Sequence, residues 1–196
     1  MKTKRVASMM PLLASIGFGI AALASPFLLA NHYIMVDNKS YNVDNYLFFF
    51  WAKYYTVTGV NMIQSQTSMY DFGDFPIYAM AAIIIGLVLG AVSAFGGRGI
   101  MLNIKGRELK IKLDTNPVYL QIFGLIFLIM SYIYLGRGST LLGLDLQFNN
   151  YVIENGPAVE FLFGSIIALS ISTIMTAAKY LKEEKLPKKN NKVSAV

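Results

Sequence analysis

Four long apolar segments, separated by polar ones, are the feature that most limits how this chain can fold. Each has about the 20 residues that a helix needs to cross roughly 30 Å of hydrocarbon. Only helices and closed barrels satisfy their backbone in that solvent, and these segments lack the residue alternation of barrel strands. We therefore predict a single membrane domain, 1–196, with four transmembrane helices at 6–30, 76–96, 117–136 and 157–180.

Composition agrees with a membrane protein. The 196 residues are 55% hydrophobic and only 14% charged, whereas about a quarter of the residues of a soluble domain are charged. The basic start "MKTKR" also suits a cleaved signal peptide, but the apolar run after it is longer than the roughly 7–15 residues of a signal core. The first segment is therefore expected to stay in the protein as a helix.

Lysine and arginine are concentrated on one side of the predicted spans. Most precede the first span, lie between the second and third, or cluster at the end of the fourth. The other two loops hold only Lys39, Lys53 and Arg137. The positive-inside rule then assigns a side of the plasma membrane to each region: both termini, the 97–116 loop and the 181–196 tail are cytoplasmic, and the 31–75 and 137–156 loops are outside.

The basic tail "KYLKEEKLPKKNNK" has a simple role in this topology. Such a run fixes orientation and meets lipid headgroups, so the bilayer is an expected partner and nucleic acid is not. On the other side, "DNKS" offers Asn38 as a glycosylation acceptor in an outer loop.

Small residues predict how the helices pack, because apolar burial does not drive helices together in lipid. They recur every fourth position in three of the helices, including Gly86 with Gly90 and Gly164 with Ala168. We expect packing within one bundle, with self-association through the "GLVLG" face as the alternative. The third helix lacks this pattern and is expected to fill the remaining space with aromatic residues, namely Phe123, Phe127, Tyr132 and Tyr134.

Glu160 is the one charge in the four apolar segments, the last of which is counted here from 157 to 178, and it falls in the first turn of its helix. Ionisable groups within membrane spans usually mark transport or proton transfer, so their scarcity argues against a transporter. Glu160 is expected either to pair with Arg137 or to face the membrane interface.

The 31–75 loop is too long for a bare connection. Its segments "HYIMV", "YNV", "YLFFFWAKYYTV" and "NMIQSQTSMY" are rich in β-branched and aromatic residues, with turn sequences "DNKS" and "TGVN" between them. They predict two hairpins, with "YLFFFWAKYYTV" as one strand. The fold class is thus an all-α transmembrane four-helix bundle with a small extracellular antiparallel β-sheet.

The most aromatic part of this loop includes Phe49, Phe50, Trp51, Tyr54 and Tyr55. Strand alternation sends part of such a set toward the helix ends, so we expect these residues to form the core of the cap. In that case truncating Trp51 to alanine costs about 3–5 kcal/mol. The alternative is an exposed docking face for a partner.

The layout and this aromatic run resemble the claudin and peripheral-myelin-protein superfamily. The claudin hallmark is W-x-L-W followed by two cysteines about ten residues apart. Here "FFFW" stands at that place with Trp51 at the second tryptophan, while Tyr54 and Gln64 occupy the cysteine positions. The passage "LQFNNYVIENGPAVEFLFGSIIAL" also looks like the claudin second outer loop running into the fourth helix. The resemblance implies lateral or cell-surface association through the outer loops.

Nothing in the sequence indicates a reaction. The chain has one histidine, His32, and no cysteine, whereas copper, haem and di-iron sites draw on several such ligands or clustered carboxylates. Asp71 and Asp74 suit a turn better than an ion site, and "GGRG" follows a span and is expected to be a turn as well. We therefore expect no enzyme activity, cofactor or metal.

Two functions are favoured by the sequence, and a third possibility, a transporter or channel, predicts ion flux in liposomes. The first is a non-catalytic interaction or adhesion protein that associates with itself or with another membrane protein through its outer loops. The second is a small accessory subunit of a larger membrane complex, such as a respiratory oxidase or a membrane monooxygenase, whose aromatic surface is buried on partners.

Overall fold

A computed structural model gives the fold of the chain. It describes residues 2–36, 38–49, 51–58, 61–68, 75–94, 100–104, 107–111, 116–137 and 152–184.

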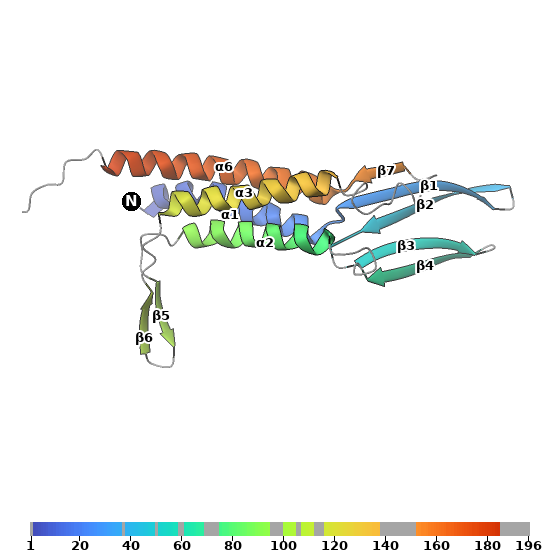
Figure 1. Cartoon of the computed structure of the whole chain (residues 1–196), viewed down its shortest axis with the longest axis horizontal. Coiled ribbons are helices and arrows are strands. Elements are labelled where there is room, and N and C mark those ends of the chain that lie inside the picture. The colour runs from blue at the N-terminus through green and yellow to red at the C-terminus, as the bar shows by residue number, and fades with distance from the viewer. Residues whose placement is uncertain are drawn as a thin grey trace, which may run out of the picture.

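Four helices lie side by side in an elongated bundle, and a β-sheet extends from one end of it (Figure 1). The helices are α1 (Lys2–Ala24), α2 (Phe75–Ser93), α3 (Pro117–Gly136) and α6 (Pro157–Glu184). The last three are long and apolar enough to cross a membrane, whereas the apolar part of α1, Met9–Ala24, is shorter. A multi-pass helical membrane protein is thus supported by three spans. The start of α1 and the end of α6 lie together, opposite the sheet (Figure 1).

Local sequence fixes the start of α3 where it was predicted. Pro117 is the first helical residue, a position at which the missing N–H of proline costs nothing. Asn116 caps the helix, and its side chain accepts a hydrogen bond from the Val118 N–H at 3.0 Å. This bond satisfies one of the amide groups that have no partner inside the helix.

The first helix ends at Ala24, so the prediction of a helix to residue 30 is wrong. Pro26 explains the early end, because its ring disfavours helical backbone at the residue before it and it has no N–H to donate. The chain then enters strand β1 at Leu28, where pairing with strands on both sides satisfies the backbone. One apolar run is therefore shared between a helix and a strand.

Glycines set the distance between α2 and α3. A Cβ atom added to Gly86 or to Gly124 would lie 2.9 Å from the carbonyl oxygen of the other residue. Gly90, one turn along α2, lies against side chains of Leu12 and Leu169, with a Cβ distance of 3.6 Å to each. The "GLVLG" face is thus used inside the bundle, in agreement with the predicted packing.

The small face of α6 packs on α1. A Cβ at Gly164 would lie 3.4 Å from the Phe18 ring, and Ala168 is buried. Between these helices the buried Ser15 and Ser165 hydroxyls lie 3.0 Å apart, and Ser165 also donates to the Ser15 carbonyl. Such bonds hold helices together in lipid.

The aromatic residues of α3 do not fill the bundle interior, contrary to the prediction. Phe123 and Tyr134 are exposed on the helix surface, and Phe127 is half-buried. Tyr132 alone packs against the core, with its ring centroid 5.7 Å from that of Phe163. The glycine contact with α2 leaves no room for large rings, so smaller side chains face inward in steps of four and three: Pro117, Gln121, Gly124, Leu128, Ser131 and Leu135.

The sheet at the end of the bundle has five antiparallel strands in the order β4-β3-β2-β1-β7. Four strands form the two hairpins predicted between the first and second spans, and the fifth precedes α6. The strands are β1 (Leu28–Val36), β2 (Lys39–Leu47), β3 (Trp51–Thr58), β4 (Asn61–Ser68) and β7 (Val152–Asn155). The stretch predicted as one strand, "YLFFFWAKYYTV", is divided between β2 and β3, because the chain reverses after Leu47 and the start of β3 pairs antiparallel with the end of β2.

The two hairpins of the sheet are joined only near the bundle. Strand β2 pairs with β3 through Tyr46–Lys53 and Leu47–Ala52, whereas β1 and β2 pair over nine positions. The hairpins therefore separate toward their tips (Figure 1). The sheet is therefore continuous at its base and split into two hairpins at its far end.

The segment between α2 and α3, predicted as a loop, contains a further hairpin of two strands. These are β5 (Ile100–Ile104) and β6 (Arg107–Ile111), paired antiparallel. The hairpin lies at the end of the bundle opposite the sheet and points away to one side, transverse to the bundle axis (Figure 1).

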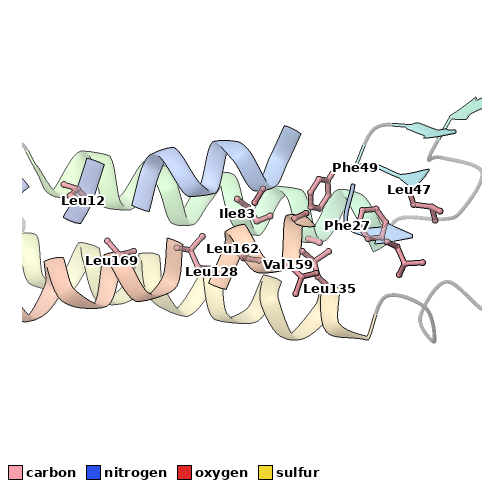
Figure 2. Close-up of a cluster of buried hydrophobic side chains, with 14 residues drawn as sticks. Leu12, Phe27, Leu47, Phe49, Ile83, Leu128, Leu135, Val159, Leu162 and Leu169 are labelled. Carbon is pink, nitrogen blue, oxygen red and sulfur yellow. The ribbon is translucent and has the colours of Figure 1, made fainter. Parts of the chain in front are cut away.

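One hydrophobic core serves both the bundle and the sheet. Its buried side chains extend from Leu12 and Leu169 between the helices to Phe27, Leu47 and Phe49 at the base of the sheet (Figure 2). The sheet thus has no separate core where it joins the helices, and the two parts are expected to be stable together.

Candidate interaction surface at the sheet end

Phe49 anchors the sheet to the helices. Its side chain is 1% exposed and its ring stacks on the buried Phe27, with ring centroids 5.3 Å apart and planes tilted by 36°. Burying an aromatic side chain removes a large apolar area from water. The cap interpretation of the aromatic run therefore holds at Phe49, which is unavailable to a partner.

The backbone around Pro26 and Phe27 holds three segments together. The Phe27 N–H donates to the Leu47 carbonyl at 2.8 Å, and the Phe27 carbonyl accepts from the Gly156 N–H at 2.9 Å. The Pro26 carbonyl accepts from Ala158 N–H at 3.1 Å. This junction joins the end of α1, the end of β2 and the start of α6.

Gly156 is required for this junction. A Cβ atom at this position would overlap the carbonyl oxygen of Pro26, and that oxygen belongs to the backbone and cannot rotate away. Sequence reasoning singled out neither Phe27 nor Gly156. The glycine directly before Pro157, where a span begins, was the available signal, because close backbone approach favours glycine.

The other predicted aromatic residues lie on or beside β3. Phe50 and the side chains of Trp51, Tyr54 and Tyr55 lie outside the described residues, so their predicted burial stays a prediction. The backbone register pairs Trp51 with Ser68, Tyr54 with Ser65 and Tyr55 with Gln64. Alternation along a strand places Trp51 and Tyr55 on one face of the sheet and Tyr54 on the other.

Of the two expectations for Glu160, the pair with Arg137 is not found among the described residues, and a position at the interface stays a prediction. Both side chains are exposed, and no ion pair joins them in the part of the chain that the structure describes. Glu160 lies in the first turn of α6, as the sequence indicated. A carboxylate there is favoured by the partial positive charge of the helix N-terminus, which accounts for it without a partner.

Asn38 lies at the tip of the β1–β2 hairpin. It is exposed and has a φ of 61°, a left-handed backbone that asparagine tolerates better than most residues. Val36 and Lys39 are the last pair of the ladder, so the hairpin reverses at the start of the predicted turn sequence "DNKS". An acceptor asparagine at such a tip is sterically open to modification.

The described residues contain no group of three or more histidine, cysteine, aspartate or glutamate side chains placed to hold a metal ion. The backbone of His32 pairs with Val43 in the sheet, and the "DFGD" segment with Asp71 and Asp74 lies outside the described residues. The features that the structure brings together at this end are the junction, the sheet and its two edge strands, β4 and β7. This sequence matches no protein-family model and no curated protein.

Proposed function

We propose that this is a non-catalytic plasma-membrane protein that associates with copies of itself, or with another membrane protein, through the sheet. In this proposal α1 also spans the membrane, both termini are cytoplasmic and the sheet stands outside. The position of the helix ends supports this topology, because the start of α1 and the end of α6 lie together, opposite the sheet (Figure 1).

The observation that carries the proposal is the sheet itself. It joins strands from both predicted outer loops into one platform that shares its core with the helices. A sheet that is anchored at its base presents two edges, and the backbone groups of an edge strand can pair with another chain. The claudin-like layout read from the sequence implies the same use of the outer loops.

The first test is native-gel mobility of the gently solubilised protein. A ladder of self-oligomers is expected. Co-migration with a haem or metal complex would instead favour the accessory-subunit alternative. A single species at the size of one chain, also after chemical cross-linking in the membrane, would refute self-association.

Edge variants then locate the contact. Charged residues on an edge strand oppose pairing with another chain, so the double substitution of Gln64→Lys and Gln66→Lys on β4 is expected to shorten the ladder. Met35→Lys is the control. Met35 is 72% exposed on the other hairpin, so this substitution adds a positive charge to the sheet away from β4. Thermal unfolding of both variants shows whether the fold is kept.

A further inference from the structure

The β5–β6 hairpin has two chemically different faces. Its register pairs Ile100 with Ile111, Leu102 with Leu109 and Ile104 with Arg107. Paired residues share a face, and alternate residues along a strand return to it. Five of the six positions on this face are therefore aliphatic, and the sixth is an arginine beside the turn. The opposite face is mostly polar: Met101, Asn103, Glu108 and Lys110.

A two-stranded hairpin is marginal in water unless its apolar face packs on something. Within the part of the chain that the structure describes, neither β5 nor β6 pairs with any other strand. Figure 1 shows the hairpin standing clear of the four helices. Whatever covers the apolar face of the hairpin must therefore be found beside the hairpin, away from the four helices.

Two features of position indicate the lipid surface. The hairpin follows α2, whose apolar span ends at Ser93, and it precedes α3, whose span begins at Pro117. It is thus tethered at the membrane boundary by short segments on both sides. It also points to one side, transverse to the bundle axis, just beyond the end of α2 (Figure 1), which is the direction of a membrane surface when the helices cross it.

Charge indicates which lipids suit it. Residues 97–116 hold five cations and two carboxylates. Four of the cations are on or next to the hairpin: Lys105, Arg107, Lys110 and Lys112. Basic segments beside a span are attracted to anionic headgroups, and the attraction is screened by salt.

We propose that the β5–β6 hairpin is an interfacial anchor that lies on the membrane surface. Its face of Ile100, Leu102, Ile104, Leu109 and Ile111 enters the boundary between headgroups and acyl chains, and its lysines and arginine bind anionic headgroups. An amphipathic element of this kind binds through apolar area and charge together. The inference does not depend on the function proposed for the sheet at the other end.

The test uses the full chain, which contains no cysteine and so accepts a single labelled one. Leu102→Cys and Asn103→Cys are adjacent in β5 but on opposite faces, and each is labelled with the environment-sensitive fluorophore NBD. The labelled proteins are reconstituted in phosphatidylcholine vesicles with about one-third phosphatidylglycerol, with or without a quencher on the acyl chains. The label at 102 is expected to shift to the blue and to be quenched, and the label at 103 to do neither.

The headgroup contribution has its own comparison. Replacing the four hairpin cations by glutamine should reduce quenching at position 102, as should pure phosphatidylcholine or high salt. The matched control replaces four tail lysines by glutamine and should leave quenching unchanged: Lys182, Lys185, Lys188 and Lys189.

Three results would overturn the proposal. Equal signals from the two faces would mean that the apolar face does not enter lipid. A blue shift at 102 without quenching would mean that protein, not lipid, covers it. Quenching that is unchanged in the variant without hairpin cations would remove the anionic headgroups from the inference.

Discussion

Phe27 and Phe49 stack at the point where the sheet meets the helices, with ring centroids 5.3 Å apart and both side chains buried. Phe27 follows α1 and Phe49 follows β2, so this contact closes the base of the β1–β2 hairpin over the bundle core (Figure 2). We expect Phe49→Ala to lower the free energy of unfolding by about 3–5 kcal/mol, through lost burial and the cavity that remains.

Denaturant or thermal unfolding in detergent measures this effect, and Met35→Ala is the control because Met35 is 72% exposed on β1. The sheet and the bundle share one core, so both should lose stability in Phe49→Ala. A variant in which the sheet alone unfolds early would show that the two parts are energetically separate.

Gly156→Ala is expected to disrupt the junction between β7 and α6. The added methyl group would overlap the Pro26 carbonyl oxygen, so β1 and β7 must move apart or the bond from Gly156 N–H to Phe27 must break. Overpacking that forces a backbone shift typically costs about 1–3 kcal/mol. Unfolding measurements would detect it, together with faster proteolysis near β7.

Gly136→Ala is the matched control for this substitution. No atom of the described residues lies within 4 Å of a Cβ at Gly136, and the residue belongs to a helix, where alanine is the better helix former. The control should therefore be neutral or slightly stabilising. Equal destabilisation by the two changes would argue against the close approach at Gly156.

Gly124→Ala is expected to separate α2 from α3. Its Cβ would lie 2.9 Å from the Gly86 carbonyl oxygen, and a backbone atom cannot move without shifting the helix. Gly17→Ala is the comparison in α1, where nothing lies within 4 Å of the added carbon. Unfolding in mixed micelles should show a clear loss for Gly124→Ala and little change for Gly17→Ala.

Gly86→Ala, with Gly17→Ala again as the comparison, tests the alternative use of the "GLVLG" face. Because Gly86 packs against Gly124 inside the bundle, a substitution there should lower stability before it changes oligomer size. A variant that keeps full stability but loses its oligomers would place this face between chains.

The sequence predicted the helical spans well, because about 20 apolar residues without charge have few alternatives. The prediction was wrong where one apolar run forms both the end of a helix and the start of a strand, on either side of Pro26. Hydropathy alone does not distinguish a buried strand from the continuation of a helix. The prediction for α3 was also wrong, because the inward face of this helix is marked by the heptad-like spacing of Gln121, Gly124, Leu128 and Ser131 and not by its large aromatic residues.

The candidate surface was predicted in part. The aromatic run did mark the base of the sheet, but only the contact with Phe27 shows that Phe49 is an anchor. Phe27 lies in the first apolar block, about twenty residues from its partner, and no local pattern links the two. Long-range packing of this kind is set by the whole fold, which periodicity and propensity do not report.

Gln121 is buried between α2 and α3 with one polar atom that has no partner. Its Nε2 donates to the Ser93 hydroxyl at 2.9 Å, and that hydroxyl donates to the Gly90 carbonyl at 2.6 Å. Among the residues that the structure describes, its Oε1 has no hydrogen-bond partner. Leu169 lies against Gly90 and Gly124. About one helical turn further from the sheet, three buried residues are polar: Ser93, Gln121 and Ser172.

We predict that Gln121→Leu changes the free energy of unfolding by no more than about 1 kcal/mol. The substitution removes the buried Oε1, which was desolvated without gaining a hydrogen bond, and this is favourable. It also removes the bond from Nε2 to the Ser93 hydroxyl, which is unfavourable, although that hydroxyl keeps its bond to Gly90. The two effects are of similar size. Ser131→Ala is the comparison. It removes the buried hydrogen bond from Ser131 Oγ to the Ala79 carbonyl at 2.9 Å, so that carbonyl loses one of its donors. Ser131→Ala should cost about 0.5–1.5 kcal/mol. A loss of unfolding free energy above about 2 kcal/mol for Gln121→Leu would instead show that Oε1 has a hydrogen-bond partner in the membrane. The first candidate is an ordered water among the buried Ser93, Gln121 and Ser172.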